Sequence, residues 1–193
     1  MNRHVKWRYH DYILFFLAIP LLLTILYFIP NAVKELLILD VKNYSILNIF
    51  FSNFVHSNLQ HFLGNLAVYL ITMFLIFRLE TDKKLFYVIM SLLFIVFPFL
   101  NSLFIIYTLP SLPPIQGFSA IGSGLLGYFL YVVCGYLRNS YDKTLKSSFI
   151  TLLLMLNFSI MLFYRGEILY FILTFVIGAI LTYNNRVQIA NIV

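Results

Sequence analysis

Long apolar stretches separated by short polar segments dominate the pattern of this 193-residue chain. Each stretch approaches the roughly 20 residues that an α-helix needs to cross the hydrocarbon of a bilayer. The pattern predicts membrane-spanning helices over residues 12–29, 59–77, 85–106, 118–136, 148–163 and 168–183. Several of these runs hold only 16–19 residues, so we expect short spans whose flanking side chains reach the membrane surface.

The connection between the first two spans is long and mixed in character. Residues 31–58 alternate charged side chains with isoleucine, leucine and phenylalanine, which is typical of a segment that lies partly in the membrane interface and contains short helices. The chain shows no internal repeat and no second domain. The pattern therefore predicts an all-α membrane protein, with residues 1–193 forming a single bundle of six transmembrane helices and a long first outer loop.

Composition supports a membrane protein and excludes several other classes. Hydrophobic residues make up 62% of the chain and charged residues only 10%, which is more apolar surface than a soluble domain of this size can cover. The net charge of +6 is interpreted as a topology signal, so no nucleic-acid partner is expected. Cys134 is the single cysteine, which excludes an intrachain disulfide and a cysteine metal cluster.

Basic residues are distributed unequally between the two sides of the predicted bundle. With six spans, both termini lie on one side, and that side holds ten lysines and arginines against three on the other. Because cytoplasmic loops carry an excess of these residues, we expect both termini in the cytoplasm. The second, fourth and sixth spans then begin at the outer face. The expected location is the plasma membrane of a prokaryote, although an organelle membrane would give the same pattern.

The segment Pro113–Tyr128 is unusually rich in small residues, with four of the eight glycines of the chain. On a helix, Ser119, Ser123 and Gly127 share one face, which allows neighbouring backbones to approach closely. One interpretation is a tightly packed helix without chemistry. The other is that Ser119, at the outer end of the fourth span, is a nucleophile.

Polar residues also gather at the outer end of the second span. His61 and Asn65 are four residues apart and stack on one helix face, while His56 falls just outside this helix or in its first turn. Hydrogen bonds between helices are one interpretation of these groups. A zinc site is disfavoured because two histidines without a nearby carboxylate or cysteine are a poor ligand set. Together with Ser119, which enters from the same side, the imidazole and amide donors suit an oxyanion hole beside a serine nucleophile.

These patterns resemble those of the rhomboid family of intramembrane serine proteases. The second span is similar to the histidine-rich second helix of that family, and the fourth span is similar to its G-x-S-G opening. The six-span topology and the long first outer loop agree with the resemblance. It rests on two motifs: His56-x4-His61-x3-Asn65, and Gly117-Phe118-Ser119-Ala120 with Gly127 eight residues after the serine.

The resemblance implies an endopeptidase that needs no metal or cofactor and acts on transmembrane segments of other proteins within the lipid bilayer. Ser119 would be the nucleophile, and its backbone N–H with the side chains of His61 and Asn65 would form the oxyanion hole. The other motif residues would assist: His56 as a supporting residue, Gly117 by allowing a tight backbone, and Gly127 by close helix packing.

The chain departs from the family pattern at the general base. Family proteases carry a histidine on the sixth helix, where this chain aligns Phe171, and no histidine follows His61. Ser123 stands where the family carries an aromatic partner for the base, and Ala120 replaces a glycine. Without a base the serine hydroxyl is a weak nucleophile.

Three hypotheses follow from this departure. The first is an active protease in which His61 or His56 serves as a substitute base, with Lys146 disfavoured because it lies on the cytoplasmic side. The second is an inactive rhomboid-like protein that binds transmembrane segments without cutting them. The third is an unrelated transporter, against which stands the lack of an inverted repeat or a carboxylate relay in the sequence.

Overall fold

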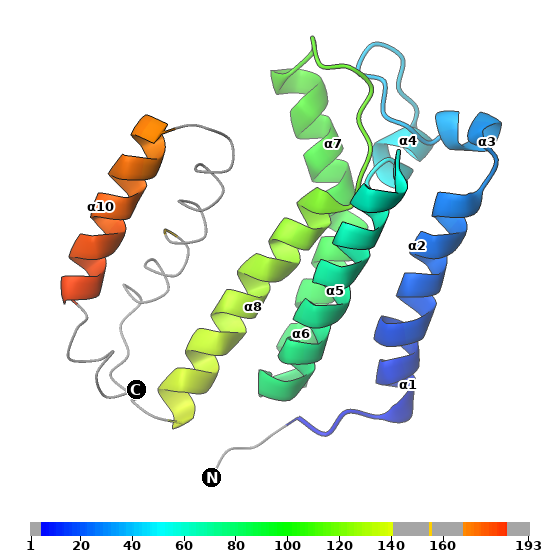
Figure 1. The fold of residues 1–193 in the computed structure, drawn as a ribbon. Helices are drawn as coiled ribbons and strands as arrows, with labels where there is room; N and C mark the ends of the chain where they lie inside the picture. The colour runs from blue at the N-terminus through cyan, green and yellow to red at the C-terminus, as the bar shows by residue number, and fades with distance from the viewer. Residues whose placement is uncertain (1–4, 141–154, 156–167, 185–193) are drawn as a thin grey trace. The chain divides into compact units, whose positions relative to one another are not determined.

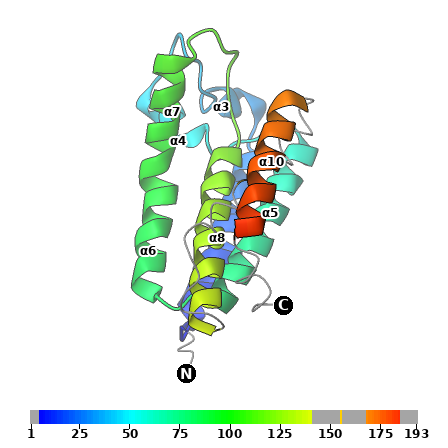
Figure 2. The ribbon, with the colours of Figure 1, turned by 90° about the vertical axis from the view of Figure 1, so that its left-hand side faces the viewer.

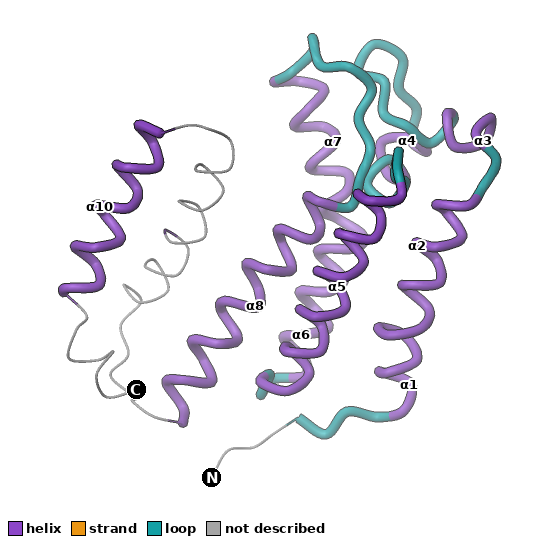
Figure 3. Tube along the Cα trace, in the orientation of Figure 1, coloured by secondary structure: helices purple, strands orange, loops and turns teal. Residues whose placement is uncertain are grey.

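The computed structural model describes residues 5–140, 155 and 168–184, and within these ranges the chain is helical with no strand. Four helical segments are long and apolar enough to cross a membrane (Figure 1; Figure 3), which confirms the prediction of an all-α membrane protein. These segments are Tyr9–Phe28, Leu59–Leu79, Lys83–Thr108 and Ser119–Ser140.

The spanning segments are longer than the sequence pattern suggested, with 20, 21, 26 and 22 residues. The expectation of short spans is wrong for the first, second and fourth of these segments, because each helix continues into polar flanking residues. Arg78 and Arg138, for example, are helical. Long basic side chains can extend from a helix end to the membrane surface, so hydropathy alone ends such a helix too early.

Two of these segments change their helical geometry immediately before a proline. The first consists of α1 (Tyr9–Tyr12), the π-helical η1 (Ile13–Ala18) and α2 (Ile19–Phe28). The other consists of α6 (Lys83–Ser91), the π-helical η2 (Leu92–Val96) and α7 (Phe97–Thr108). The residue before each proline donates its N–H five residues back, from Ile19 to Leu14 and from Phe97 to Leu92. A wider π turn accommodates Pro20 and Pro98, which supply no N–H of their own.

The long first loop is folded against the segment that precedes α8 (Ser119–Ser140). It contains α3 (Asn31–Glu35) and α4 (Ile46–Phe51), and it lies at the same end of the helices as residues 109–118 (Figure 1; Figure 2). Leu39 and Ile115 form an antiparallel bridge with N–H to O distances of 3.0 and 2.9 Å. The N–H of Gly117 donates to the Ser52 carbonyl at 2.8 Å. These bonds set the position at which α8 begins.

A buried amide joins α4 to α7. The side-chain nitrogen of Asn53 donates to Ser102 Oγ at 3.0 Å, and its oxygen accepts from Asn101 at 2.8 Å. Ser102 Oγ in turn donates to the Ile49 carbonyl at 2.6 Å. Polar side chains within a membrane helix usually satisfy one another in this way. The network holds the long first loop on the helix end where the candidate site lies.

The chain divides into two compact units, which are described separately. One contains Val5–Arg78 and Asp82–Leu126, and therefore α5 (Leu59–Leu79) and the start of α8. The other includes Leu79–Thr81 and Gly127–Val193, with the hydroxyl of Tyr128 donating to the buried Glu80 carboxylate. The predicted sixth span corresponds to α10 (Ile168–Asn184), an apolar helix of 17 residues. The predicted fifth span, 148–163, lies outside the described residues except for position 155.

Candidate functional site

The N-terminus of α5 is capped by an asparagine. The side-chain oxygen of Asn58 accepts from the N–H of His61 at 2.8 Å, and its carbonyl accepts from Phe62 at 3.1 Å. This N-cap satisfies donors that would otherwise lack intrahelical partners. The cap places His61 in the first turn of α5, with a partly exposed imidazole, and leaves His56 outside the helix.

His56 and Asn65 are joined by a hydrogen bond, and His61 packs against His56. His56 is fully buried, and its Nε2 lies 3.1 Å from the amide nitrogen of Asn65. Because the amide nitrogen donates, Nε2 is assigned as the acceptor and Nδ1 carries the proton. The rings of His56 and His61 meet edge to face, with 5.4 Å between their centroids. The second-span motif therefore forms one cluster.

Burial lowers the pKa of His56 from an ordinary value of 6.5 to about 4. The neighbouring His61 adds to this shift, and the backbone of Phe54 opposes it in part. The Nδ1 atom makes no hydrogen bond of standard geometry to a described group. His56 is therefore neutral at pH 7 and, with this pKa, is a poor proton acceptor for a serine hydroxyl.

This shift predicts a pH-dependent loss of stability. The unfolded chain binds a proton on His56 below about pH 6.5, whereas the folded protein binds it only near pH 4, so stability falls as the pH drops through this window. The expected loss is about 3 kcal/mol by the linkage relation. It is measured as thermal unfolding in detergent micelles between pH 7 and pH 4. The matched variant His56→Asn should lose markedly less over the same range, and an identical pH profile in both proteins would contradict the prediction.

Gly117 brings the start of α8 against the histidine cluster. Its φ of +133° is a conformation that residues with a side chain rarely adopt. A Cβ built on Gly117 would lie 2.9 Å from Cε1 of His61, so the backbone rests directly on the imidazole. Ser119 follows two residues later as the first residue of α8, and its side chain is exposed. Both predicted motifs thus meet at one end of one compact unit.

The helix start supplies backbone donors beside Ser119. The N–H of Gly122 bonds to the Phe118 carbonyl at 2.9 Å and begins the hydrogen-bond ladder of α8. The N–H groups of Ser119 and Ala120 precede this bond and face out of the positive end of the helix dipole. This arrangement can stabilise a carbonyl oxygen or an anion placed next to Ser119.

The predicted nucleophile is not hydrogen-bonded to a base in the described structure. Within residues 5–140, 155 and 168–184, the Oγ of Ser119 has no hydrogen-bond partner, while its carbonyl accepts from Ser123 Oγ at 2.8 Å. The amide of Asn65, predicted as an oxyanion donor, is directed to His56. The His61 imidazole likewise makes no hydrogen bond to a described group. Its assignment as oxyanion donor or substitute base stays a prediction.

Two further predicted positions lie in the other compact unit. A Cβ at Gly127 would meet no described atom within 4 Å, whereas one at Gly124 would lie 2.6 Å from a Leu93 side-chain carbon. Among the described residues, close packing on α8 is thus seen at Gly124, another glycine of the segment Pro113–Tyr128. Phe171 lies in the first turn of α10, and its side chain is not among those described.

Gln116 is a further residue of this region that the sequence did not identify. Its side-chain oxygen is buried and has no hydrogen-bond partner among the described groups, directly before Gly117. A buried amide oxygen without a partner is costly and marks a place where a donor can bind. The feature of the sequence that could have identified it is a single side-chain amide in the charge-free, proline-rich loop before the fourth span.

The described part of the chain offers no ligand set for a metal ion. It contains no group of three or more histidine, cysteine, aspartate or glutamate side chains that could hold one. Comparison of the chain with models of protein families, with curated proteins and with solved structures found no match.

Proposed function

We propose that this protein is a rhomboid-like integral membrane protein that binds transmembrane segments of other membrane proteins and does not cleave them. The observation that carries the proposal is the state of Ser119, whose exposed hydroxyl has no base among its described neighbours. His56 is buried and bonded to Asn65, and its pKa of about 4 makes it a weak base. The sequence places Phe171 where the family carries its catalytic histidine.

The same geometry supports binding. Backbone donors at the start of α8 and the partly exposed His61 offer hydrogen bonds to the main chain of a segment that unwinds near the membrane surface. Exposed leucines at the same end of α5, Leu59 and Leu63, offer apolar contacts. A segment with exposed peptide groups would find partners here that lipid cannot supply.

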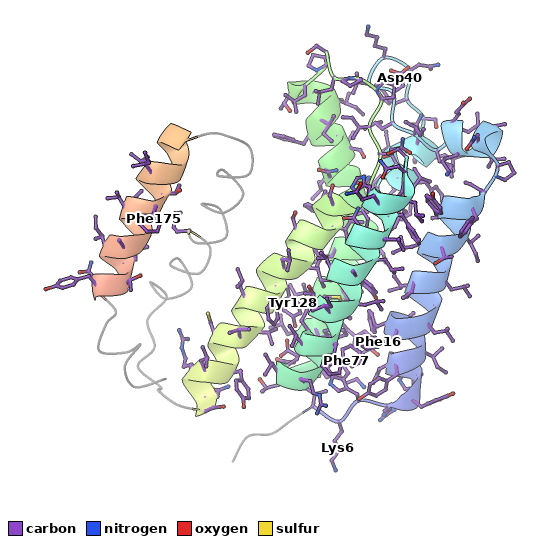
Figure 4. All side chains as sticks on the ribbon, viewed as in Figure 1. Lys6, Phe16, Asp40, Phe77, Tyr128 and Phe175 are labelled. Carbon is purple, nitrogen blue, oxygen red and sulfur yellow. The ribbon has the colours of Figure 1, made fainter. Side chains whose placement is uncertain are left out.

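Charge supports an orientation with this site at the outer face and both termini in the cytoplasm, and we propose the plasma membrane of a prokaryote as the location. Within the unit that holds the site, Asp40 lies at the end that carries the outer loop and Lys6 lies at the opposite end (Figure 4). Basic residues follow the same division. Lys6, Arg8, Arg78, Lys83 and Lys84 belong to the end of Lys6, and Lys34 and Lys42 belong to the outer loop.

A serine endopeptidase that uses His61 as its base is the second candidate. It is favoured by one observation, the contact of the His61 ring with Gly117, two residues before the serine. In this candidate the hydroxyl and the imidazole form their hydrogen bond in the substrate complex, where catalytic hydrogen bonds often first form. The candidates differ in whether Ser119 reacts.

Covalent labelling of Ser119 distinguishes the binding protein from the serine endopeptidase. We expect a fluorophosphonate probe to label the wild-type protein in native membranes no more than the Ser119→Ala variant, because an unassisted hydroxyl reacts about 10²–10⁴-fold more slowly than one with a general base. In-gel fluorescence with a known serine hydrolase as positive control gives the readout. Labelling that disappears in both Ser119→Ala and His61→Ala would overturn the proposal in favour of the protease.

Photo-crosslinking tests binding itself. A photoreactive residue at Leu63 should capture transmembrane peptides, and one at Ile71, two turns further along α5, should capture fewer, although both positions are exposed. Equal capture at the two positions would contradict a site at the outer end.

Solute flux in proteoliposomes, which neither candidate predicts, would instead support a transporter.

A further inference from the structure

A second cluster of polar residues lies at the opposite end of the same compact unit. The segment from Lys6 to His10 and the first five residues of α6 line an open cavity of about 630 Å³. Its lining combines basic side chains, a histidine and two aromatic rings, and no acidic residue is among them. The lining residues are Lys6, Trp7, Arg8, His10, Lys83 and Tyr87.

Buried contacts hold the walls of this cavity. The carboxylate of Asp11 is fully buried and accepts hydrogen bonds from the Arg8 N–H at 2.6 Å, from Lys83 and from the Tyr87 hydroxyl. The indole N–H of Trp7 donates to the Phe77 carbonyl at 2.6 Å. The basic groups therefore converge because the backbone before α1 is tied to α5 and α6.

The charge of this cluster remains positive after its internal pairing. Asp11 offsets one of the three positive charges of Lys6, Arg8 and Lys83, and the exposed side chains of Lys6 and Arg8 remain available. A phosphodiester fits this combination, because the ammonium group of Lys6 and the guanidinium group of Arg8 bind phosphate oxygens.

An apolar groove of about 360 Å³ begins at the wall of the basic cavity. It runs along one face of α6 and η2, and Tyr87 lines both spaces. The groove is lined by Tyr87, Val88, Ser91, Leu92, Ile95 and Val96. At 1.5 Å per residue these positions span about 13 Å, close to the thickness of one hydrocarbon leaflet, about 15 Å.

We propose that these two spaces bind one anionic phospholipid of the leaflet that contacts the Lys6 end, with its phosphate in the basic cavity and an acyl chain in the groove. Basic cavities at the cytoplasmic ends of membrane helices bind acidic headgroups. A free phosphate would use the cavity but gain nothing from the groove. The proposal does not depend on whether the outer site binds or cleaves peptides.

Native mass spectrometry of the full-length protein tests this inference, with phosphatidylglycerol and phosphatidylcholine of identical acyl chains as probes. The wild type should retain phosphatidylglycerol preferentially. Retention of phosphatidylglycerol by the double variant Lys6→Gln/Arg8→Gln should be about 10- to 30-fold lower than by the wild type. Each basic group near an acidic surface strengthens binding about fivefold. The matched control Arg78→Gln/Lys84→Gln removes the same charge at the same end but outside the cavity, and should change retention less than about twofold.

Three results would overturn the inference. These are equal retention of the two lipids, equal loss in the two double variants, and displacement of the lipid by soluble glycerol phosphate. A separate pair of variants tests the groove. Ser91→Phe should lower phosphatidylglycerol retention because the larger side chain fills the groove, whereas Ser91→Ala should leave retention unchanged. If Ser91→Phe has no effect, the acyl chain does not bind in the groove. If the Lys6/Arg8 double variant fails to fold, Lys6→Gln alone changes only an exposed side chain and should still reduce retention about fivefold.

Discussion

Replacing Phe171 by histidine is expected to convert the protein into a detectable protease. Under the proposed function, Ser119 and the backbone donors at the start of α8 are present, and the missing component is a general base. Supplying one should accelerate cleavage of a model transmembrane substrate by about 10²–10⁴-fold over the wild type. The measurement is product formation in proteoliposomes, together with fluorophosphonate labelling of Ser119.

The neighbouring position Leu173 provides the matched control. Leu173→His introduces the same group on α10, two residues away and therefore on a different helix face. It should give no cleavage, and neither should the double variant Phe171→His/Ser119→Ala. If the folded Phe171→His protein shows no cleavage and no labelling, the alignment of the sixth span with the rhomboid pattern is wrong.

Gly117→Ala is expected to destabilise the fold by about 3 kcal/mol or more, the sum of backbone strain and a steric clash. The φ of +133° disfavours any side chain, and the new Cβ would lie 2.9 Å from His61 Cε1. The imidazole would have to move, or the loop would have to release its hydrogen bond to Ser52. Thermal unfolding in detergent micelles measures the effect.

Gly64→Ala is the matched control for this substitution. A Cβ at Gly64 meets no described atom within 4 Å, and the residue is helical. The stability of the Gly64→Ala protein should therefore equal or slightly exceed that of the wild type. If both variants unfold at the wild-type temperature, the close contact between Gly117 and His61 does not exist in the protein. Loss of stability confined to Gly117→Ala would support the meeting of the two motifs.

Local features of the sequence were sufficient for the membrane class and for the approximate position of four helices. Hydrophobicity over about 20 residues and the charge of the flanking segments are properties of each stretch by itself, so they can be predicted without knowledge of packing. The ends were less accurate, since Arg78 and Arg138 continue helices that hydropathy alone terminates.

The residues of the candidate site could be predicted from the sequence, but the hydrogen bonds and contacts between them could not. The spacing of His61 and Asn65 placed both on one helix face, and topology placed Ser119 at the same end. That spacing did not indicate that Asn65 binds His56, because nine residues and a change of backbone direction separate them. It also did not indicate that Gly117 rests on His61.

The sequence by itself determined an all-α membrane protein and the polar residues at the N-terminal ends of its second and fourth spans, because hydropathy and helical spacing are local. Only the tertiary structure decided which of those groups form hydrogen bonds, how the long first loop is anchored and where the basic cavity forms. Asp11 and Lys83, for example, are 72 positions apart. Contacts of this kind depend on the packing of whole helices, which no short stretch of sequence specifies.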